Sequence, residues 1–303
     1  MEDILNDIIE KNRKFYKGGR IADYIPALKE ANISDSGLTV IDQGRNIYSA
    51  GEYNKKFTIQ SISKVISLAL AISDMGMEKV SEKLMFEGSE RSFDDIEYIS
   101  RNRISKAINP MMNSGAIVTT SMVTGGKDRF ERILSLIRDL AGNESIKLNK
   151  EVYQSEKATG DRNRAIAYLM KSKNIIDGEV SNILDDYFMQ CSIEVDTVDL
   201  ANIAFNIANR FKGIKFPSNL NKEKLSKTLI AVMAHSGMYN FSGQWSVDVG
   251  IPSKSGVAGG ILSVVPGKYG IGYFGPSLDK NGNPLVGYKV LKDLSSRLEL
   301  NIY

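Results

Sequence analysis

The stretch Ile59-Gln-Ser-Ile-Ser-Lys64 marks the change from strand-like to helical sequence in the first quarter of the chain. An apolar stripe at helical spacing predicts a helix from about Ser61 to Asp74, ended by Gly76. Ser61 and Lys64 lie one helical turn apart, so both side chains would project from one face at the start of this helix. In this S-x-x-K arrangement a lysine can activate a serine nucleophile, and the helix N-terminus favours a developing oxyanion. Alone the motif is a weak signal, since chance matches are expected.

Strand-like segments lie on both sides of this stretch and near the other end of the chain. Upstream, residues 37–42 and 46–49 flank Gln43-Gly-Arg45 and predict a β-hairpin. Downstream, the runs 244–249, 258–265 and 269–274 are separated by Gly and Pro turns and are typical of three further strands. The segment 276–284 is expected to be a loop.

Helical spacing accounts for most of the rest. It predicts an amphipathic helix over 2–15 and a closing helix over 285–300. Residues 77–235 are expected to be mostly helical, with clear periodicity at 130–140, 164–171 and 198–211.

This distribution favours an α+β fold in which one antiparallel sheet, built from both chain ends, is flanked by helices. A mostly helical lobe would be inserted into it. The expected division is a sheet lobe from about 1–76 and 236–303 and a helical lobe from about 77–235, within a single catalytic domain over 1–303.

Composition excludes several classes of protein. The 303 residues carry 39 Lys+Arg against 36 Asp+Glu, a net charge of +3, and no basic block, so nucleic acid is not an expected partner. With one cysteine and one histidine, Cys191 and His235, zinc sites built on Cys and His are excluded, and no cofactor or metal is expected. The N-terminus has no apolar leader and no run is long enough to span a membrane, which predicts a cytoplasmic protein.

Four other motifs have ordinary explanations. Gly270-Ile-Gly-Tyr-Phe-Gly275 matches G-x-G-x-x-G but lies inside a strand-like run and opens no helix, so a dinucleotide site is not expected. Asp279-Lys-Asn-Gly282 has the wrong spacing for calcium and predicts a tight turn. A second S-x-x-K match, Ser277 to Lys280, falls in that loop, where nothing fixes the two side chains. His235 precedes Ser-Gly and is interpreted as structural.

Lys254-Ser255-Gly256 is a K-[ST]-G element that precedes a strand-like run. In S-x-x-K enzymes such an element borders the active site, and its glycine lets substrate approach the backbone. Lys64 can act as a base only when neutral, and burial near a second cation lowers a lysine pKa. Lys254 is a candidate for that cation, although an exposed lysine at a strand end is the alternative.

The chain resembles the serine-dependent glutaminase family, which shares the fold of serine β-lactamases and penicillin-binding proteins. The resemblance rests on seven stretches in the family's order: 19–26 (GRIADYIP), 59–64 (IQSISK), 109–116 (NPMMNSGA), 155–163 (SEKATGDRN), 191–194 (CSIE), 235–239 (HSGMY) and 254–260 (KSGVAGG). Ser114 stands where the family pattern has alanine, and the ankyrin repeats and long N-terminal extension of animal forms are absent from this sequence.

The resemblance implies hydrolysis of L-glutamine to L-glutamate and ammonia. Ser61 would be the nucleophile, Lys64 its base and Tyr239 a proton shuttle between them. The backbone N–H groups of Ser61 and Val257 would hold the oxyanion, with Lys254, Ser255 and Gly256 in support.

The resemblance also implies a pocket for a free amino acid. Glu156 would bind the ammonium, and Asn113, Asn163 and Tyr187 the carboxylate and its surroundings, with Tyr24 contacting the substrate from the N-terminal segment. From the residues alone, the favoured interpretation is that the asparagines are turn or cap residues and Glu156 a solvated loop acid; Tyr187 and Tyr239 could otherwise be core aromatics.

Two alternatives remain at this point. A β-lactamase or peptidase could use the same Ser-Lys pair, although the sequence has no S-D-N element or export signal. A non-catalytic amino-acid sensor could keep the fold. The family's habit of self-association predicts a homodimer or homotetramer.

Overall fold

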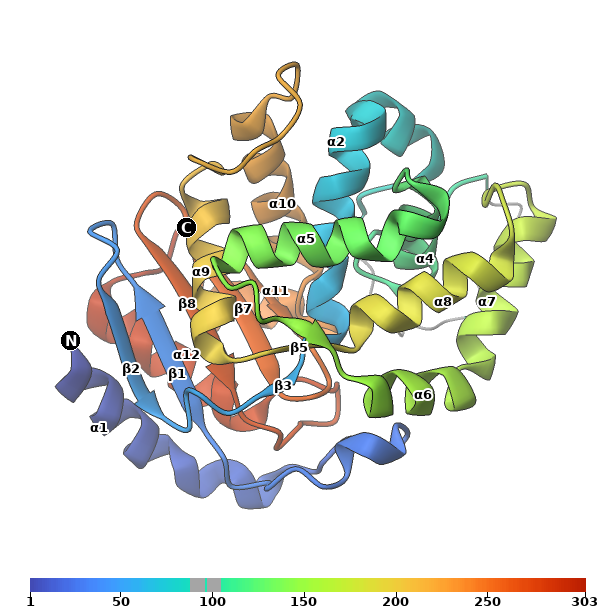
Figure 1. Cartoon of the computed structure of the whole chain (residues 1–303). Helices are drawn as coiled ribbons and strands as arrows, with labels where there is room; N and C mark the ends of the chain where they lie inside the picture. The colour runs from blue at the N-terminus through green and yellow to red at the C-terminus, as the bar shows by residue number, and fades with distance from the viewer. Residues whose placement is uncertain (88–95, 97–104) are drawn as a thin grey trace.

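The structure, a computed structural model, describes residues 1–87, 96 and 105–303. Its larger sheet has the strand order β2 (Ile47–Gly51), β1 (Gly37–Ile41), β8 (Tyr269–Phe274), β7 (Gly260–Val265) and β6 (Ser253–Ser255). All neighbouring strands are antiparallel, and β1 from the N-terminal hairpin pairs directly with β8 near the C-terminus. The predicted antiparallel sheet built from both chain ends is therefore confirmed (Figure 1).

One face of this sheet carries α9 (Thr197–Ala208), and the glycines of β8 explain how closely it packs. A Cβ atom at Gly270 would lie 2.2 Å from the Ala201 carbonyl oxygen, and one at Gly272 would lie 2.1 Å from that of Thr197. Only glycine permits this approach of helix and strand backbones. The G-x-G-x-x-G run is thus a packing device, in keeping with its interpretation as something other than a nucleotide loop.

The opposite face of the sheet is covered by α1 (Glu2–Arg13) and α12 (Leu285–Leu298). On that face, Leu38 and Val40 of β1 belong to the same buried apolar cluster as Leu5 and Ile8 of α1. The intervening Thr39 faces α9, and its hydroxyl forms a hydrogen bond with that of Thr197. This alternation is the period of two expected for a strand buried on both sides. The predicted helices over 2–15 and 285–300 are confirmed with slightly shorter bounds.

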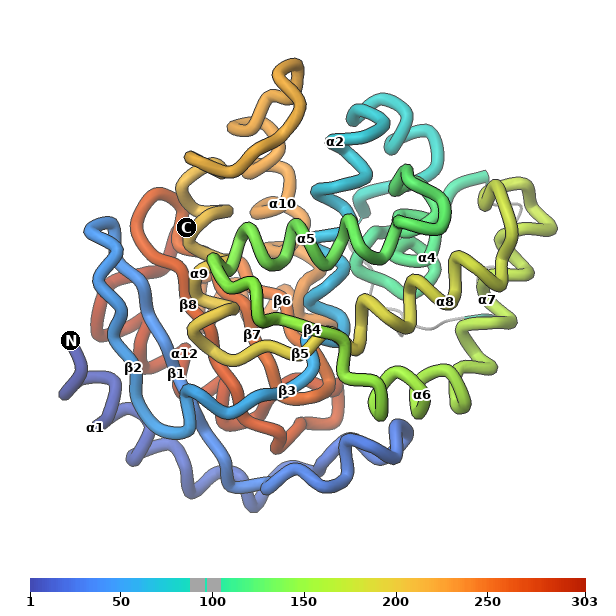
Figure 2. Tube along the Cα trace, in the orientation of Figure 1, coloured from blue at the N-terminus to red at the C-terminus, as the bar shows by residue number. Residues whose placement is uncertain are grey.

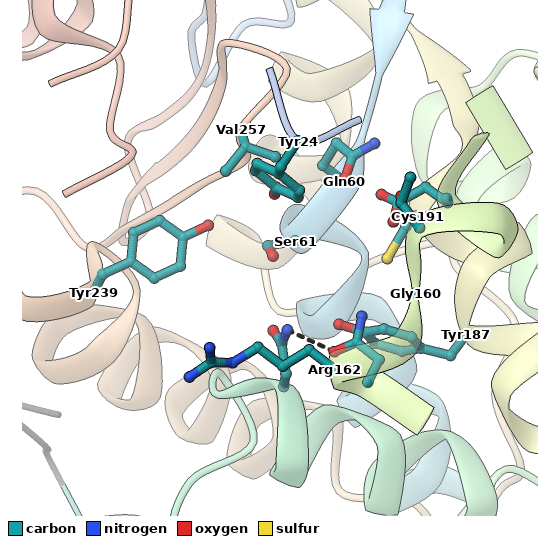
Figure 3. Close-up of a pocket in the computed structure, with 13 residues that line it drawn as sticks. Tyr24, Gln60, Ser61, Gly160, Arg162, Tyr187, Cys191, Tyr239 and Val257 are labelled. Atoms are coloured by element: carbon teal, nitrogen blue, oxygen red, sulfur yellow. Dashed lines mark hydrogen bonds between the residues drawn. The ribbon is translucent and has the colours of Figure 1, made fainter. Parts of the chain in front are cut away.

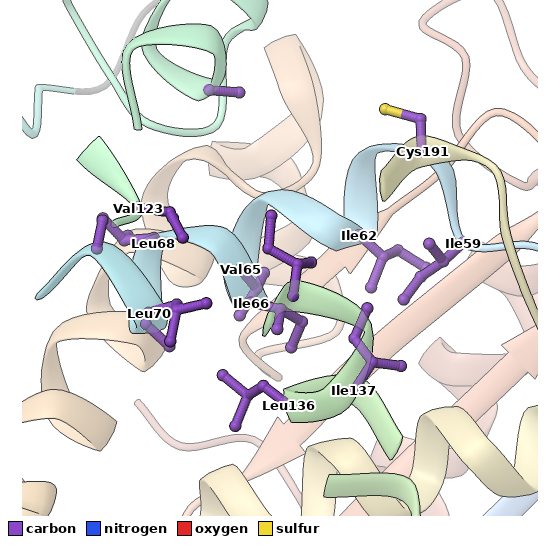
Figure 4. Packing of buried hydrophobic residues seen from close by; sticks show 14 of the residues in the cluster. Ile59, Ile62, Val65, Ile66, Leu68, Leu70, Val123, Leu136, Ile137 and Cys191 are labelled. Carbon is purple, nitrogen blue, oxygen red and sulfur yellow. The ribbon is translucent and has the colours of Figure 1, made fainter. Parts of the chain in front are cut away.

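A group of helices that includes α2 (Ser63–Lys83) packs together beside the sheet (Figures 1 and 2). In Figure 4, Val65, Ile66 and Leu70 of α2 lie among apolar side chains that include Leu136 and Ile137. Besides α2, this group of helices consists of α4 (Asn113–Met122), α5 (Arg129–Ala141), α6 (Lys150–Thr159), α7 (Asp161–Ser172), α8 (Val180–Cys191) and α10 (Lys222–Ser236). None of the helices that the structure describes is long and apolar enough to span a membrane.

A second, small sheet, which the sequence did not predict, joins the segment before Ser61 to the segments that precede α6 and follow α8. Its order is β3 (Phe57–Thr58), β5 (Ile193–Val195) and β4 (Lys147–Leu148). The backbone N–H of Ile59 also donates to the carbonyl oxygen of Ile193, 2.8 Å away. Because β3 leads into Ser61 and β4 leads into α6, this sheet sets the spacing between Ser61 and Glu156.

Residues 244–249 do not form the predicted strand but lie in and just after α11 (Ser242–Asp248), so that prediction was wrong. The alternation of Gln-Trp-Ser-Val-Asp-Val suggested a strand, yet the buried residues Ser242, Trp245 and Val249 follow helical spacing, and Val247 is 75% exposed. The Trp245 indole N–H donates to the carbonyl oxygen of Ile251 at 2.8 Å, which fixes the helix against the following turn.

The helix after Ser61 also differs in detail from the prediction. Ser61 lies in a short 3-10 turn, η3 (Gln60–Ile62), immediately before α2. Gly76, with φ of +80° and ψ of 154°, interrupts α2, but helix resumes and continues to Lys83. Glycine adopts this conformation without the penalty that a side chain would bring, so the predicted stop is a break in the helix instead of its end.

Candidate active site

A cavity of about 300 Å³ lies where η3, the starts of α4 and α7, and the ends of α6 and α8 meet the K-S-G turn after β6 (Figure 3). All the residues expected to bind substrate line it: Tyr24, Ser61, Asn113, Glu156, Asn163, Tyr187, Tyr239 and Val257. They come from segments far apart in the sequence, so the fold brings together what the sequence only suggested. In Figure 3 the hydroxyl of Tyr239 points toward Ser61 across the cavity.

Ser61 is held at the cavity wall by a constrained backbone. The preceding residue, Gln60, has a φ of +48°, which is unfavourable for a residue with a side chain and persists only where neighbours enforce it. One such neighbour is Gly256, because a Cβ atom there would lie 2.8 Å from the carbonyl oxygen of Ile59. The K-S-G turn therefore packs directly against the backbone that presents Ser61.

Lys64 is fully buried behind the cavity. Its Nζ donates to the carbonyl oxygen of Met111 at 3.1 Å and to Oδ1 of Asn113 at 2.7 Å. Asn113 in turn donates through Nδ2 to Oδ1 of Asn163 at 2.9 Å, the bond drawn in Figure 3. This chain of hydrogen bonds fixes the orientation of the Asn113 amide and connects Lys64 with the far wall of the cavity.

Tyr239 belongs to the 3-10 turn η5 (Tyr239–Phe241) and, like Gln60, has an unusual positive φ, +53°. Its phenol shares a hydrogen bond with Ser61 and donates to the carbonyl oxygen of Ser255 at 3.4 Å. Burial raises the pKa of Tyr239 to about 12, while those two hydrogen bonds oppose the shift. The phenol therefore carries its proton at neutral pH.

Lys254 is also fully buried, so it is not an exposed lysine at a strand end. Its Nζ donates to the carbonyl oxygen of Ser255 at 2.7 Å and lies 4.1 Å from the centre of the Tyr239 ring. Burial first, and the charge of Lys64 second, hold the pKa of Lys254 well below its ordinary value. The charge of Lys64 thus disfavours the charge of Lys254, and the proposed lowering of the Lys64 pKa by Lys254 stays a prediction.

Glu156 is a buried carboxylate in the opposite wall of the cavity, 8% exposed. Burial raises the pKa of Glu156 from 4.5 to about 7, and a hydrogen bond with Gln60 and the charge of Lys64 oppose that rise. The cost of burying the Glu156 charge thus exceeds what Gln60 and Lys64 return, and carboxyl groups with such shifts are frequent at binding and catalytic sites. A cationic ligand group beside Glu156 would favour its charged form.

Neither a metal nor a cysteine nucleophile is indicated in this cavity. The described part of the chain contains no cluster of His, Cys, Asp and Glu able to hold a metal ion. Burial raises the pKa of the Cys191 thiol to about 12, so it stays protonated and unreactive. His235 is exposed near the end of α10 and does not line the cavity.

Comparison with known proteins decides the family. A family model described as Glutaminase matches residues 19–303. The chain belongs to the glutaminase family. It is 49% identical over 304 residues to a glutaminase of Clostridioides difficile, covering 100% of this chain and 98% of that one. It is 47% identical over 308 residues to glutaminase 2 of Clostridium perfringens, covering 100% of both chains.

Solved glutaminase structures have the same fold. A probable glutaminase from Bacillus subtilis, complexed with 6-diazo-5-oxo-L-norleucine, superposes with a TM-score of 0.88 at 35% identity, covering 99% of this chain and 95% of that one. A covalent complex of the Bacillus subtilis glutaminase YbgJ with 5-oxo-L-norleucine gives a TM-score of 0.87 at 35% identity, covering 100% and 99%. The expected α+β fold of the glutaminases, shared with serine β-lactamases, is therefore confirmed.

The glutaminase cavity also contains residues to which the sequence analysis gave no role: Gln60, Thr159, Gly160, Arg162 and Cys191. Gln60 and Cys191 lie inside or at the edge of stretches that carry the family resemblance, and the other three lie within 155–163. The available signal for these five residues was thus their position in the sequence, close to residues already proposed for the site. Sequence could not reveal which side chain of each stretch turns inward, since that depends on the packing of α6, α7 and α8.

Proposed function

We propose that this glutaminase-family protein hydrolyses L-glutamine to L-glutamate and ammonia, with Ser61 as nucleophile. The observation that carries the proposal is one cavity of about 300 Å³ that holds Ser61, hydrogen-bonded with Tyr239, opposite the buried acid Glu156. A nucleophile and a separate buried acid fit a small zwitterion with a reactive amide at its other end.

The first half of the proposed reaction forms an ester. The Ser61 oxygen bonds to the side-chain amide carbon of glutamine while its proton passes to Lys64. The oxyanion is held by the backbone N–H groups of Ser61 and Val257, each such donor contributing roughly 100- to 1000-fold in rate. The C–N bond then breaks: Tyr239 gives its phenol proton to the leaving nitrogen, which departs as ammonia, and takes up the proton that Lys64 received from Ser61. Lys64 is then neutral again, and a glutamyl-enzyme remains.

The second half hydrolyses this ester. Water attacks the same carbon, gives a proton to Lys64, and the carbon–oxygen bond to Ser61 breaks with the proton returned to the serine. Glutamate leaves and the enzyme is restored, so the cycle needs no metal or organic cofactor.

The surroundings of Lys64 support its role as base. Two hydrogen bonds, to the Met111 carbonyl oxygen at 3.1 Å and to Asn113 Oδ1 at 2.7 Å, hold Lys64 Nζ in a fixed orientation. Lys64 follows Ser61 by three residues, about one helical turn. Burial and the second buried lysine, Lys254, both favour the neutral form of one member of the pair.

Substrate recognition is assigned to the wall opposite Lys64. Glu156 is proposed to bind the ammonium of glutamine, and Asn113, Asn163 and Tyr187 to address its carboxylate and neighbouring groups. Tyr24, 52% exposed on the N-terminal segment, is proposed to cover the bound substrate. The covalent complex of the Bacillus subtilis relative with 5-oxo-L-norleucine supports covalent chemistry on this fold.

An ammonia-release assay with the purified protein tests the function. Ammonia from glutamine, with little from asparagine and no hydrolysis of a chromogenic β-lactam, is the expected result. Hydrolysis of the β-lactam without ammonia release would favour a β-lactamase or peptidase, and saturable glutamine binding without turnover would favour a sensor. Either result contradicts the proposal.

Glu156→Gln is expected to weaken glutamine recognition because the neutral amide cannot pair with the substrate ammonium. In the wild type, kcat/KM should fall as the pH drops through about 7, where Glu156 becomes protonated. The variant should have a low kcat/KM and lose this dependence. Measurement of KM and kcat/KM between pH 5.5 and 8.5, about one unit or more on each side of that pKa, checks the assignment.

Stability provides the control for Glu156→Gln. Because burial raises the pKa of Glu156, its charged form costs the folded state free energy, and this cost grows as the pH rises from 4.5 to about 7. The variant should therefore have a higher Tm than the wild type at pH 8 and a similar Tm below pH 4.5. An unchanged kcat/KM together with that Tm difference would show that Glu156 is buried but does not bind the substrate ammonium.

The cytoplasmic location, the homodimer or homotetramer and the division into a sheet lobe and a helical lobe remain predictions. Sedimentation of the purified protein over a range of concentrations tests the self-association.

A further inference from the structure

The loop between β8 and α12 contains Asp279-Lys-Asn-Gly-Asn283, and its hydrogen bonds fold it back on itself. Oδ1 of Asp279 accepts from the backbone N–H groups of Asn281 at 2.8 Å and Asn283 at 2.9 Å. The Asp279 N–H donates to the Asn283 carbonyl oxygen at 2.8 Å, and Gly282 turns the chain with a φ of +86°. The loop is thus a rigid turn, and the proposed function gives it no task.

The side chain that this turn presents to the interior is Asn283, which is 1% exposed. Its Oδ1 accepts from the Ser255 hydroxyl at 2.6 Å, and its Nδ2 donates to the Met238 carbonyl oxygen at 3.1 Å. One planar amide therefore joins the K-S-G strand to the residue immediately before Tyr239. Tyr239 and Val257, which follow these two segments directly, line the same cavity as Ser61.

The backbone at Tyr239 needs such a restraint. A positive φ of +53° is unfavourable for an aromatic residue and relaxes unless its surroundings over-determine it. On one side Ser242 Oγ donates to the Tyr239 carbonyl oxygen at 2.8 Å, and Ser242 Oγ also accepts from the Met238 N–H at 3.0 Å. On the other side the bond from Asn283 holds the Met238 carbonyl, so the peptide groups before and after Tyr239 are each held by a hydrogen bond from a side chain.

We propose that Asn283 is a positioning residue that holds Tyr239 and the K-S-G strand in register with Ser61. The inference rests on the proposed function, because Tyr239 is the proton shuttle of that reaction. Asn283 does not line the cavity and acts through Met238 and Ser255. Its loss should therefore slow the chemical step more than it weakens substrate binding.

Two substitutions test this, one of them isosteric. Asn283→Ala removes both bonds, whereas Asn283→Asp keeps an acceptor for Ser255 and loses the donor to Met238. Because a displacement of about 1 Å at a reacting group costs on the order of 100-fold in rate, kcat should fall by about that factor with KM nearly unchanged. The aspartate variant keeps the test valid if the alanine variant fails to fold.

Asn281→Ala is the matched control. Asn281 lies in the same turn, and its side chain forms no hydrogen bond with any residue that the structure describes. This variant should keep the wild-type kcat. Active sites are counted by mass spectrometry after complete reaction with 6-diazo-5-oxo-L-norleucine, and kcat is expressed per labelled site, which separates misplacement of Tyr239 from loss of folded protein.

The outcomes are distinct. A fall in kcat per labelled site, with unchanged KM and a normal Asn281→Ala control, supports the positioning role. An unchanged kcat per labelled site, or a rise in KM alone, overturns it. Absence of ammonia release by the wild-type protein would instead overturn the proposed function.

Discussion

Replacement of Ser61 by alanine is expected to abolish ammonia release from glutamine, with kcat reduced by about 10⁴- to 10⁶-fold. Ser61 is the proposed nucleophile, and without its oxygen no ester forms, so the reaction has no other covalent route. The fold should be intact because Ser61 lies at a cavity wall and loses only a hydroxyl. Ammonia release, the Tm and labelling by 6-diazo-5-oxo-L-norleucine check the result.

Ser67→Ala is a matched control for this loss. Ser67 is buried on the same helix, three residues after Lys64, and its hydroxyl donates to the Lys64 carbonyl oxygen at 3.2 Å. It does not line the cavity, so the variant should keep activity and form the covalent adduct. Substantial turnover by Ser61→Ala with an intact fold would disprove the assigned nucleophile.

Replacement of Lys64 by methionine is expected to lower kcat by about 10²- to 10⁴-fold, the usual contribution of a general base. Methionine has a similar length but cannot accept the proton of Ser61. It also leaves the Met111 carbonyl oxygen and Asn113 Oδ1 without their donor, so some loss of Tm should accompany the loss of activity.

Two measurements separate these effects. The first is a control variant, Lys222→Met. Lys222 Nζ donates to the carbonyl oxygen of Ile214 at 2.6 Å, but Lys222 does not line the cavity, so this variant should remain active. Slow labelling of Lys64→Met by 6-diazo-5-oxo-L-norleucine that nevertheless reaches completion would indicate a folded site with a weakened nucleophile. Wild-type kcat in Lys64→Met would exclude the lysine as base.

The sequence predicted the sheet and the helix after Ser61, and each of these successes has a local cause; the residues proposed to bind substrate all line one cavity, and their roles stay predictions. Strands and long helices have periodic patterns, and Ser61 and Lys64 are brought together by a single helical turn. The misread segment around Trp245 is short, and a six-residue alternation cannot be told from part of a helix without knowing which side is buried.

Long-range packing explains what the sequence could not predict. The positive φ angles of Gln60 and Tyr239 arise from neighbours distant in the chain, and the small sheet consists of strands of two or three residues. The role of Asn283 is similar, because a Lys-Asn-Gly-Asn turn gives no sign of what its asparagine will contact. Such features become visible only when Ser255, Met238 and the turn are seen together.

The pairing of β1 with β8 has a consequence for synthesis on the ribosome. The N-terminal hairpin emerges early, but its partner strand lies more than 200 residues later, at Tyr269–Phe274. Until that strand appears, one edge of the hairpin has no neighbour to complete the sheet, and such edges promote aggregation. Nascent chains should therefore depend on chaperones until translation is nearly finished, and products that terminate before β8 should be insoluble and inactive.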